Sequence, residues 1–163
     1  HLFIRDEMKT RMCLSLIRDC VKEQARLYSF VVMSNHLHMI IKPNDHQTIS
    51  TLVKAVKVNS VTRLRKNWLP SEVSQAGMQE SLNRHQYWQA SFRGNPMYTK
   101  VVADQKTSYI HANPIRAGLV TLPEDYVWSS LNLINLGMMS EDETLDLRLA
   151  RDYYDHVLND YLS

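Results

Sequence analysis

The chain has 163 residues, which suits one domain, and 44% of them are hydrophobic, an ordinary share for a globular protein. No apolar run approaches the roughly 18–20 residues of a membrane span, so we expect no membrane association. The net charge of +2 does not by itself indicate a nucleic-acid-binding protein. The two cysteines, Cys13 and Cys20, share a face of a predicted helix as reduced core residues, which favours the cytosol.

The first half of the chain predicts a helix, a hairpin and a second helix. Residues 5–24 carry an apolar stripe at helical spacing. Residues 28–33 are rich in β-branched and aromatic side chains, and the turn at residues 34–35 leads into a second strand over residues 36–42. Residues 48–68 then have the pattern of an amphipathic helix.

The second half of the chain has a less regular pattern. Residues 71–84 predict a loop with some helix, and residues 85–89 alternate as a short strand does. Residues 98–112 predict a third helix, which Pro114 interrupts. An acidic C-terminal helix is predicted over about 141–163.

Charge is unevenly distributed along the chain. Residues 46–71 contain no acidic side chain but five cations, namely Lys54, Lys57, Arg63, Arg65 and Lys66. Beyond residue 140 acidic side chains predominate. Their charge offsets the cations of residues 46–71 in the net charge of the chain and so masks a local cationic face. The alternative interpretation is two ordinary solvated helix faces.

Two histidines lie one residue apart in the second predicted strand. Because side chains alternate across a strand, His36 and His38 point to the same face. Two imidazoles leave coordination positions open, which suits a catalytic rather than a structural ion. A His-x-His pair in an apolar strand is also commonly a surface pair, so this spacing alone does not define a site.

A second segment supplies a phenol and an amide. Tyr109 and Asn113 are four residues apart and share a face if the segment is helical. The amide oxygen of Asn113 could complete a metal site with the two histidines, and Tyr109 could attack a phosphodiester. The alternatives are a packing tyrosine and an asparagine that caps a short helix beginning at Pro114.

These segments together resemble a known family. The sequences VMSNHLH at residues 32–38, YIHANPIRAGLV at residues 109–120 and EDYVWSS at residues 124–130 resemble single-tyrosine HUH transposases. The subgroup that they resemble most is the REP-associated tyrosine transposases, relatives of insertion-sequence transposases. The resemblance covers residues 3 to 130, approximately.

The resemblance implies a fold and a domain organisation. The fold is α+β, a ferredoxin-like or RRM-like antiparallel sheet with helices against one face. We expect a single HUH (Y1-type nuclease) domain over residues 1–163. The first strand of the family, which precedes its first helix, is apparently absent from this chain.

The resemblance also implies an activity, that of a metal-dependent single-stranded DNA endonuclease and strand transferase. Tyr109 is the expected catalytic residue, and His36, His38 and Asn113 are the expected ligands of Mg²⁺ or Mn²⁺. Attack by Tyr109 at a hairpin-flanked site forms a 5′-phosphotyrosine intermediate, which a free 3′-OH later reverses on another strand. The expected location is the bacterial cytoplasm, in association with the nucleoid.

Recognition of single-stranded or hairpin DNA requires cations for the backbone and aromatic rings for the bases. The predicted DNA-binding residues are Lys54, Lys57, Arg63, Arg65, Lys66, Arg93 and Arg116. One alternative is a catalytically inactive or domesticated hairpin-binding protein, and another is a structural metal or hydrolase domain. The choice between a monomer and a homodimer stays open, because the insertion-sequence relatives exchange tyrosine helices between two chains whereas the REP-associated group acts within one chain.

Overall fold

A computed structural model describes residues 3, 5–67 and 88–132 of the chain. Within α2 the side chains of residues 64–67 are not described. The predicted loop over residues 71–84 and the predicted acidic helix over residues 141–163 lie outside the described residues. So does most of the short strand predicted over residues 85–89, and the described Trp88 and Gln89 are not in a strand.

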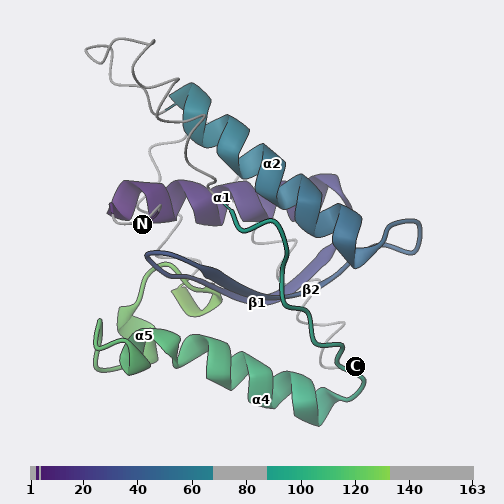
Figure 1. Ribbon diagram of the computed structural model, residues 1–163. Helices are drawn as coiled ribbons and strands as arrows, with labels where there is room; N and C mark the ends of the chain where they lie inside the picture. The colour runs from purple at the N-terminus through teal and green to yellow at the C-terminus, as the bar shows by residue number, and fades with distance from the viewer. Residues whose placement is uncertain (1–2, 4, 68–87, 133–163) are drawn as a thin grey trace.

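An antiparallel hairpin forms the middle layer of the described structure (Figure 1). It consists of β1 (Arg26–Val32) and β2 (Leu37–Lys42). The helices α1 (Asp6–Lys22) and α2 (Ile49–Asn67) lie together on one face of it. The order α1–β1–β2–α2 is that of the central part of a ferredoxin-like β-α-β-β-α-β unit. The α+β class predicted from the sequence is therefore confirmed.

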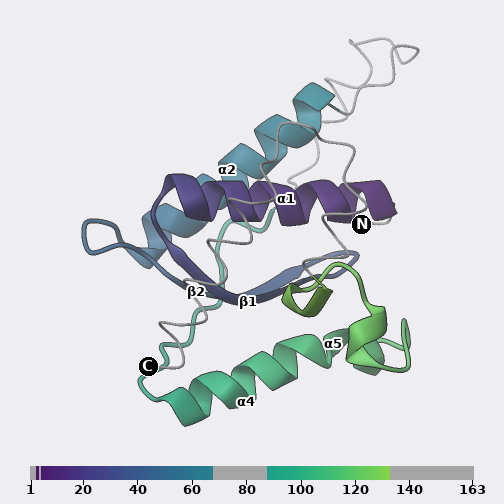
Figure 2. The same cartoon turned by 180° about the vertical axis from the view of Figure 1, so that it is seen from behind.

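A second layer of helices covers the opposite face of the hairpin (Figures 1 and 2). It is formed by α4 (Lys100–His111) and the short α5 (Asn113–Arg116). The 3₁₀ turns η1 (Pro123–Asp125) and η2 (Ser130–Asn132) follow, and residues 128–130 run along the free edge of β1, where the Val32 amide donates to the Trp128 carbonyl. The expectation of helices against one face only is wrong.

Both faces of the hairpin are apolar, which explains why both are covered. Phe30 and Val32 pack against α1 and α2, whereas Val31 and Ile40 pack with Ile110 of α4. A bulge between Leu27 and Ser29 shifts the register, which pairs Ile41 with Leu27 and Ile40 with Ser29, so that Tyr28 also joins the α4 side. We call the two clusters the α1–α2 core and the α4 core.

The α1–α2 core contains both cysteines. Cys13 and Cys20 are free thiols, fully buried among Met12, Leu16 and Ile17. Burial raises the pKa of both thiols, which keeps them protonated and unreactive. Their prediction as reduced core residues is confirmed.

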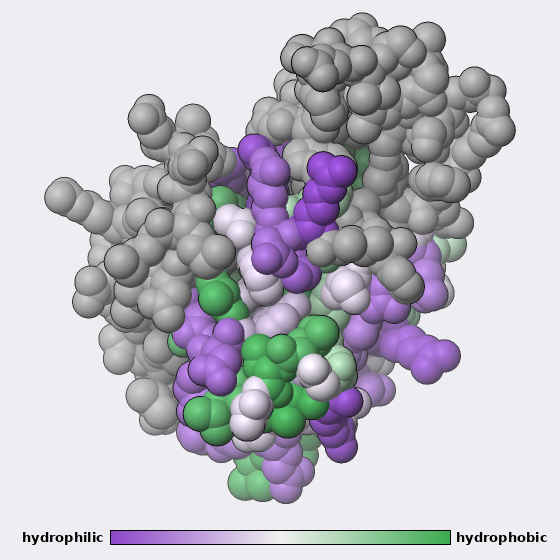
Figure 3. Space-filling model, turned by 90° about the vertical axis from the view of Figure 1, so that its left-hand side faces the viewer, coloured by the Kyte–Doolittle hydropathy of each residue, from purple (hydrophilic) through white to green (hydrophobic). Residues whose placement is uncertain are grey.

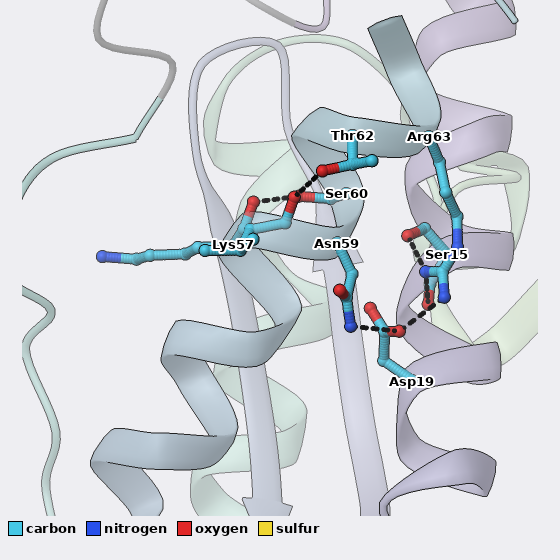
Figure 4. Close-up of polar contacts among 8 residues, drawn as sticks. Ser15, Asp19, Lys57, Asn59, Ser60, Thr62 and Arg63 are labelled. Carbon is cyan, nitrogen blue, oxygen red and sulfur yellow. Dashed lines mark hydrogen bonds and ion pairs between the residues drawn. The ribbon is translucent and has the colours of Figure 1, made fainter. Parts of the chain in front are cut away.

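A buried polar network joins α2 to α1 (Figure 4). Asp19 of α1 is fully buried, and its Oδ1 accepts hydrogen bonds from the Arg63 guanidinium at 2.7 Å and the Asn59 amide at 3.1 Å. Arg63 also donates to the Ser15 hydroxyl and carbonyl oxygens. In Figure 4 the side chain of Lys57 points away from this network. Arg63 therefore compensates the charge of a buried carboxylate at the helix–helix contact.

Candidate active site

Two imidazoles meet at the start of β2. His38 is opposite Val31 in the hairpin, and His36 lies just before the strand, in the connection between β1 and β2. The ring centroids are 4.8 Å apart and the ring planes are nearly perpendicular, at 85°. His38 alternates with Leu37 and Met39, which pack on the α1–α2 core, so it faces the α4 side.

Both histidines are suited to metal binding in their protonation state. Partial burial lowers the pKa of each imidazole, and the neighbouring His36 lowers the pKa of His38 further. The Nδ1 of His36 lies 2.6 Å from Oδ1 of Asn35, a carboxamide oxygen that can only accept. Nδ1 therefore carries the proton, and Nε2 presents its lone pair.

Tyr109 lies beside this pair on the last turn of α4. Its ring centroid is 6.3 Å from that of His38, and the residue is 46% exposed. The next residue, Ile110, is buried in the α4 core and anchors the helix to the hairpin. Because successive helical residues turn by about 100°, Tyr109 is left at the rim of this contact, open to solvent.

Two other tyrosines are rival nucleophiles. Tyr126 is buried and donates its hydroxyl to the Val32 carbonyl at 2.8 Å, and burial raises its pKa. Tyr98 is 88% exposed but precedes Thr99, the N-cap of α4. It lies eleven positions before Tyr109, which at the helical rise is roughly 16 Å along the axis. Of the three, Tyr109 alone combines exposure with proximity to His38.

Asn113 ties the end of α4 to the start of α5. Its amide nitrogen donates to the carbonyl oxygens of Tyr109 at 2.9 Å and Ile110 at 3.2 Å. The N-cap of α5 is Ala112, so the interpretation of Asn113 as that cap is wrong. The backbone dihedral angles of Ala112 stay close to helical values, so Asn113 is the first residue of α5. Its side chain is directed back toward the last turn of α4. This contact leaves its Oδ1 available as a ligand atom.

The three predicted donors have the chemistry that a divalent ion requires. Among the described residues no group of three or more His, Cys, Asp or Glu side chains could hold a metal. A third ligand drawn from the described residues would thus be of another kind, and the Oδ1 of Asn113 offers a neutral oxygen. Two imidazole nitrogens and one amide oxygen leave positions open for phosphate and water, and they suit Mn²⁺ better than the oxygen-preferring Mg²⁺.

Cations surround the Tyr109 ring. The guanidinium carbon of Arg116 is 4.7 Å from the ring centroid, and Nζ of Lys106 is 5.9 Å from it. Lys106 was not among the residues predicted from the sequence. Its position three residues before Tyr109 on a predicted helix was a signal that could have identified it.

The other predicted DNA-binding cations lie elsewhere, mostly on α2, which is on the opposite face of the hairpin from α4 (Figure 1). Lys54 is exposed, whereas Lys57 donates to the carbonyl oxygens of Gln89 and Ser91. Arg63 is committed to Asp19, and Arg93 is exposed in the segment before α4. The side chains of Arg65 and Lys66 are outside the described residues.

Apolar side chains are exposed in the segment that contains Arg116. Figure 3 shows hydrophobic residues gathered in the lower part of one side of the molecule, over α5 and the segment that follows. Ile115, Leu119 and Leu122 are the large exposed side chains of this region. Arg116 is itself exposed, so this apolar patch and the cation lie on the same open surface.

Comparison with known proteins identifies one family. The family model described as "Transposase IS200 like" matches residues 1–113. The matched residues include the histidine pair, Tyr109 and Asn113. No curated protein and no solved structure matches the chain significantly. None of the described helices is long and apolar enough to cross a membrane.

Proposed function

The chain belongs to the IS200-like transposase family and is therefore a DNA-binding transposase; we propose that it acts as an endonuclease and strand transferase. In this proposal the activity depends on a metal ion and the substrate is single-stranded DNA. Its substrates are hairpin-flanked sites, and Tyr109 forms a 5′-phosphotyrosine intermediate with them. The observation that supports this proposal best is the proximity of the Tyr109 and His38 rings, 6.3 Å apart at their centroids. The two residues are 71 positions apart in the sequence, and the packing of α4 on the hairpin brings them together.

The proposed residue roles follow from the chemistry of a phosphodiester. The Tyr109 oxygen forms a bond to phosphorus while the bond to the 3′-oxygen breaks. The phenol proton leaves to solvent, and the leaving 3′-oxygen takes up a proton from solvent to give the free 3′-OH. His36 and His38, with the amide oxygen of Asn113, would hold Mg²⁺ or Mn²⁺. When bound, that ion supplies Lewis-acid stabilisation of the charge that grows on the phosphate. The phosphotyrosine link retains the free energy of the phosphodiester bond that was broken. Strand transfer therefore needs no nucleotide cofactor.

We also propose that the site acts within one chain. The histidine pair and Tyr109 lie together in a single copy of the protein. A homodimer that exchanges α4 is the alternative, and it requires this contact to open. Mixing two inactive variants distinguishes the possibilities, because only exchange can rebuild an intact site from one chain with Tyr109→Phe and another with His38→Ala.

The test of the proposed function is formation of a covalent adduct. The protein is incubated with Mn²⁺ or Mg²⁺ and hairpin oligonucleotides taken from the DNA that flanks its gene. We expect a denaturation-resistant complex whose nucleotide maps to Tyr109 by mass spectrometry. Tyr109→Phe should remove it, and the matched control Tyr98→Phe should not.

The other outcomes separate the alternatives. Hairpin binding without any adduct would favour a catalytically inactive DNA-binding protein. Tight metal binding without DNA binding would favour a structural metal or hydrolase domain. A nucleotide found on Tyr98 or Tyr126 would exclude the site described above.

A further inference from the structure

Arg116 is placed over Tyr109 by the junction between α4 and α5. Ala112 keeps near-helical dihedral angles, φ −82° and ψ −8°, so α5 continues α4 with little change of direction. The Asn113 amide reinforces the junction by donating to the Tyr109 carbonyl. Seven residues are close to two helical turns, so Arg116 returns to the side of α4 on which Tyr109 lies.

The end of α5 is fixed as sharply as its start. Gly118 has φ +67°, a conformation that glycine adopts without strain. Its amide donates to the Ile115 carbonyl, and the Leu119 amide donates to the Pro114 carbonyl, which closes the helix. The four-residue helix is thus held at both ends, and the backbone that carries Arg116 is defined.

The donors of Arg116 are free toward a ligand. Within the described part of the chain its guanidinium has no hydrogen bond and no ion pair. It makes a cation–π contact with Tyr109, in which the guanidinium carbon is 4.7 Å from the ring centroid. A guanidinium that contacts a ring keeps donors available along its planar edge. These donors suit the paired oxygens of a phosphate.

We propose that Arg116 is a catalytic residue that binds the phosphate attacked by Tyr109; this inference rests on the proposed function. The contact with the ring fixes the cation beside the phenol, so a phosphate bound by Arg116 lies next to the attacking oxygen. In the reaction the bond from Tyr109 to phosphorus forms and the bond to the 3′-oxygen breaks. Arg116 stays protonated throughout and stabilises the negative charge on the non-bridging oxygens.

Lys106 provides a matched comparison on the same ring. Its ammonium lies further from the Tyr109 centroid, at 5.9 Å, and it belongs to α4 itself. An ammonium is a point charge without the planar fork of a guanidinium. Both residues contribute positive charge near Tyr109, but Arg116 alone offers paired donors to the reacting phosphate.

The first experiment measures the rate of adduct formation at saturating oligonucleotide in a single turnover. By analogy with the loss of one preorganised oxyanion donor, Arg116→Gln should slow the reaction roughly 10²–10³-fold. Arg116→Lys should restore only part of the rate, because the charge returns without the fork. Lys106→Gln should slow the reaction clearly less than Arg116→Gln, because it removes a point charge and no paired donors, and the melting temperature of all variants should be unchanged. A normal rate for Arg116→Gln would overturn the inference while leaving the proposed function intact.

The second experiment measures binding rather than activity. In a Tyr109→Phe background, the phosphate that the wild-type protein cleaves is replaced by an uncharged methylphosphonate. The replacement should weaken binding when Arg116 is present and have little effect in Arg116→Gln, and a methylphosphonate two positions away should show no such coupling. Equal losses with and without Arg116 would overturn the inference. If the wild-type protein forms no adduct with any oligonucleotide, the proposed function and this inference both fail.

Discussion

Arg63 and Arg116 lie on opposite sides of the same hairpin and differ in what they contact. Arg63 pairs with the fully buried Asp19 and with Ser15, and so joins α2 to α1. Arg116 contacts the half-exposed Tyr109 ring and pairs with no described carboxylate. The two arginines therefore differ in role because their partners differ in burial. Arg63 neutralises a buried carboxylate, whereas Arg116 lies beside a ring that is open to solvent. Arg63 thus belongs to the packing of the α1–α2 side, whereas the proposed chemistry lies on the α4 side.

The largest effect should come from the histidines on the α4 side. We expect His36→Ala and His38→Ala each to abolish cleavage, because the metal ligands are lost, while hairpin binding and melting temperature change little. Adduct formation and binding are measured on the same samples. Cleavage near the wild-type rate in both variants would show that the pair holds no catalytic ion.

On the α1–α2 side, removing a cation should cost stability instead. Arg63→Met leaves Asp19 buried without its counter-charge and should lower the free energy of unfolding by about 2–3 kcal/mol. The value is set below the range for fully buried pairs because the Arg63 side chain is 31% exposed. Urea denaturation should show a change under about 0.5 kcal/mol for Arg116→Gln. Equal losses in the two variants would erase the contrast, and Asp19→Asn should rescue part of the Arg63→Met loss.

The pH dependence of metal binding sharpens the description of the α4 side. Protons compete with the metal for the imidazoles, and the pKa values of His36 and His38 are lowered below the ordinary 6.5. Affinity for Mn²⁺ should therefore persist as the pH falls to 6.5 and decline only below it, by up to about tenfold per pH unit for each histidine. Calorimetric titration between pH 8 and 5 measures this. A decline that begins above pH 7 would contradict the lowered pKa values.

Asn113 tests whether one residue serves both structure and chemistry. Asn113→Ala removes the two hydrogen bonds that the side-chain amide donates to α4 and should lower the free energy of unfolding by about 1 kcal/mol. As a ligand, Asn113 also predicts weaker metal affinity in that variant. Asn113→Asp keeps an oxygen but loses the donor, so it should lose stability and retain metal binding. Unchanged metal affinity in Asn113→Ala would remove the residue from the site.

The smallest effect concerns the cations of α2. If this helix contacts single-stranded DNA, Lys54→Gln should make the slope of log affinity against log salt shallower by about 0.7. Lys57→Gln should leave the slope unchanged, because its ammonium is bound by the carbonyl oxygens of Gln89 and Ser91. An unchanged slope in both variants would place the DNA-binding surface away from α2.

The regular elements could be predicted because their information is local. The helix predicted over residues 48–68 is observed as Ile49–Asn67, and the strand predicted over residues 36–42 as Leu37–Lys42. Apolar periodicity fixes such elements to within a residue or two. The proximity of the histidine pair to Tyr109 was expected from family resemblance, since no local pattern contains it.

What could not be predicted depends on contacts between distant residues. The partner of Arg63 lies 44 positions earlier in the chain, and nothing in the charge run marks Arg63 as different from Lys54. The sequence analysis expected helices on one face only, because no local pattern assigns α4 to the second face of the hairpin. The contact of Asn113 depends on a near-helical Ala112, which spacing rules do not specify.

The contact of Lys57 with Gln89 and Ser91 sets the length of a tether. Thr99, where α4 is capped, is only eight positions after Ser91, so the start of α4 lies within roughly 27 Å of that anchor. A short tether gives Tyr109 an effective concentration on the order of millimolar at the histidines of its own chain. At micromolar protein we therefore expect the site to assemble within one chain in preference to exchange between chains, so that adduct formation per molecule should not depend on protein concentration.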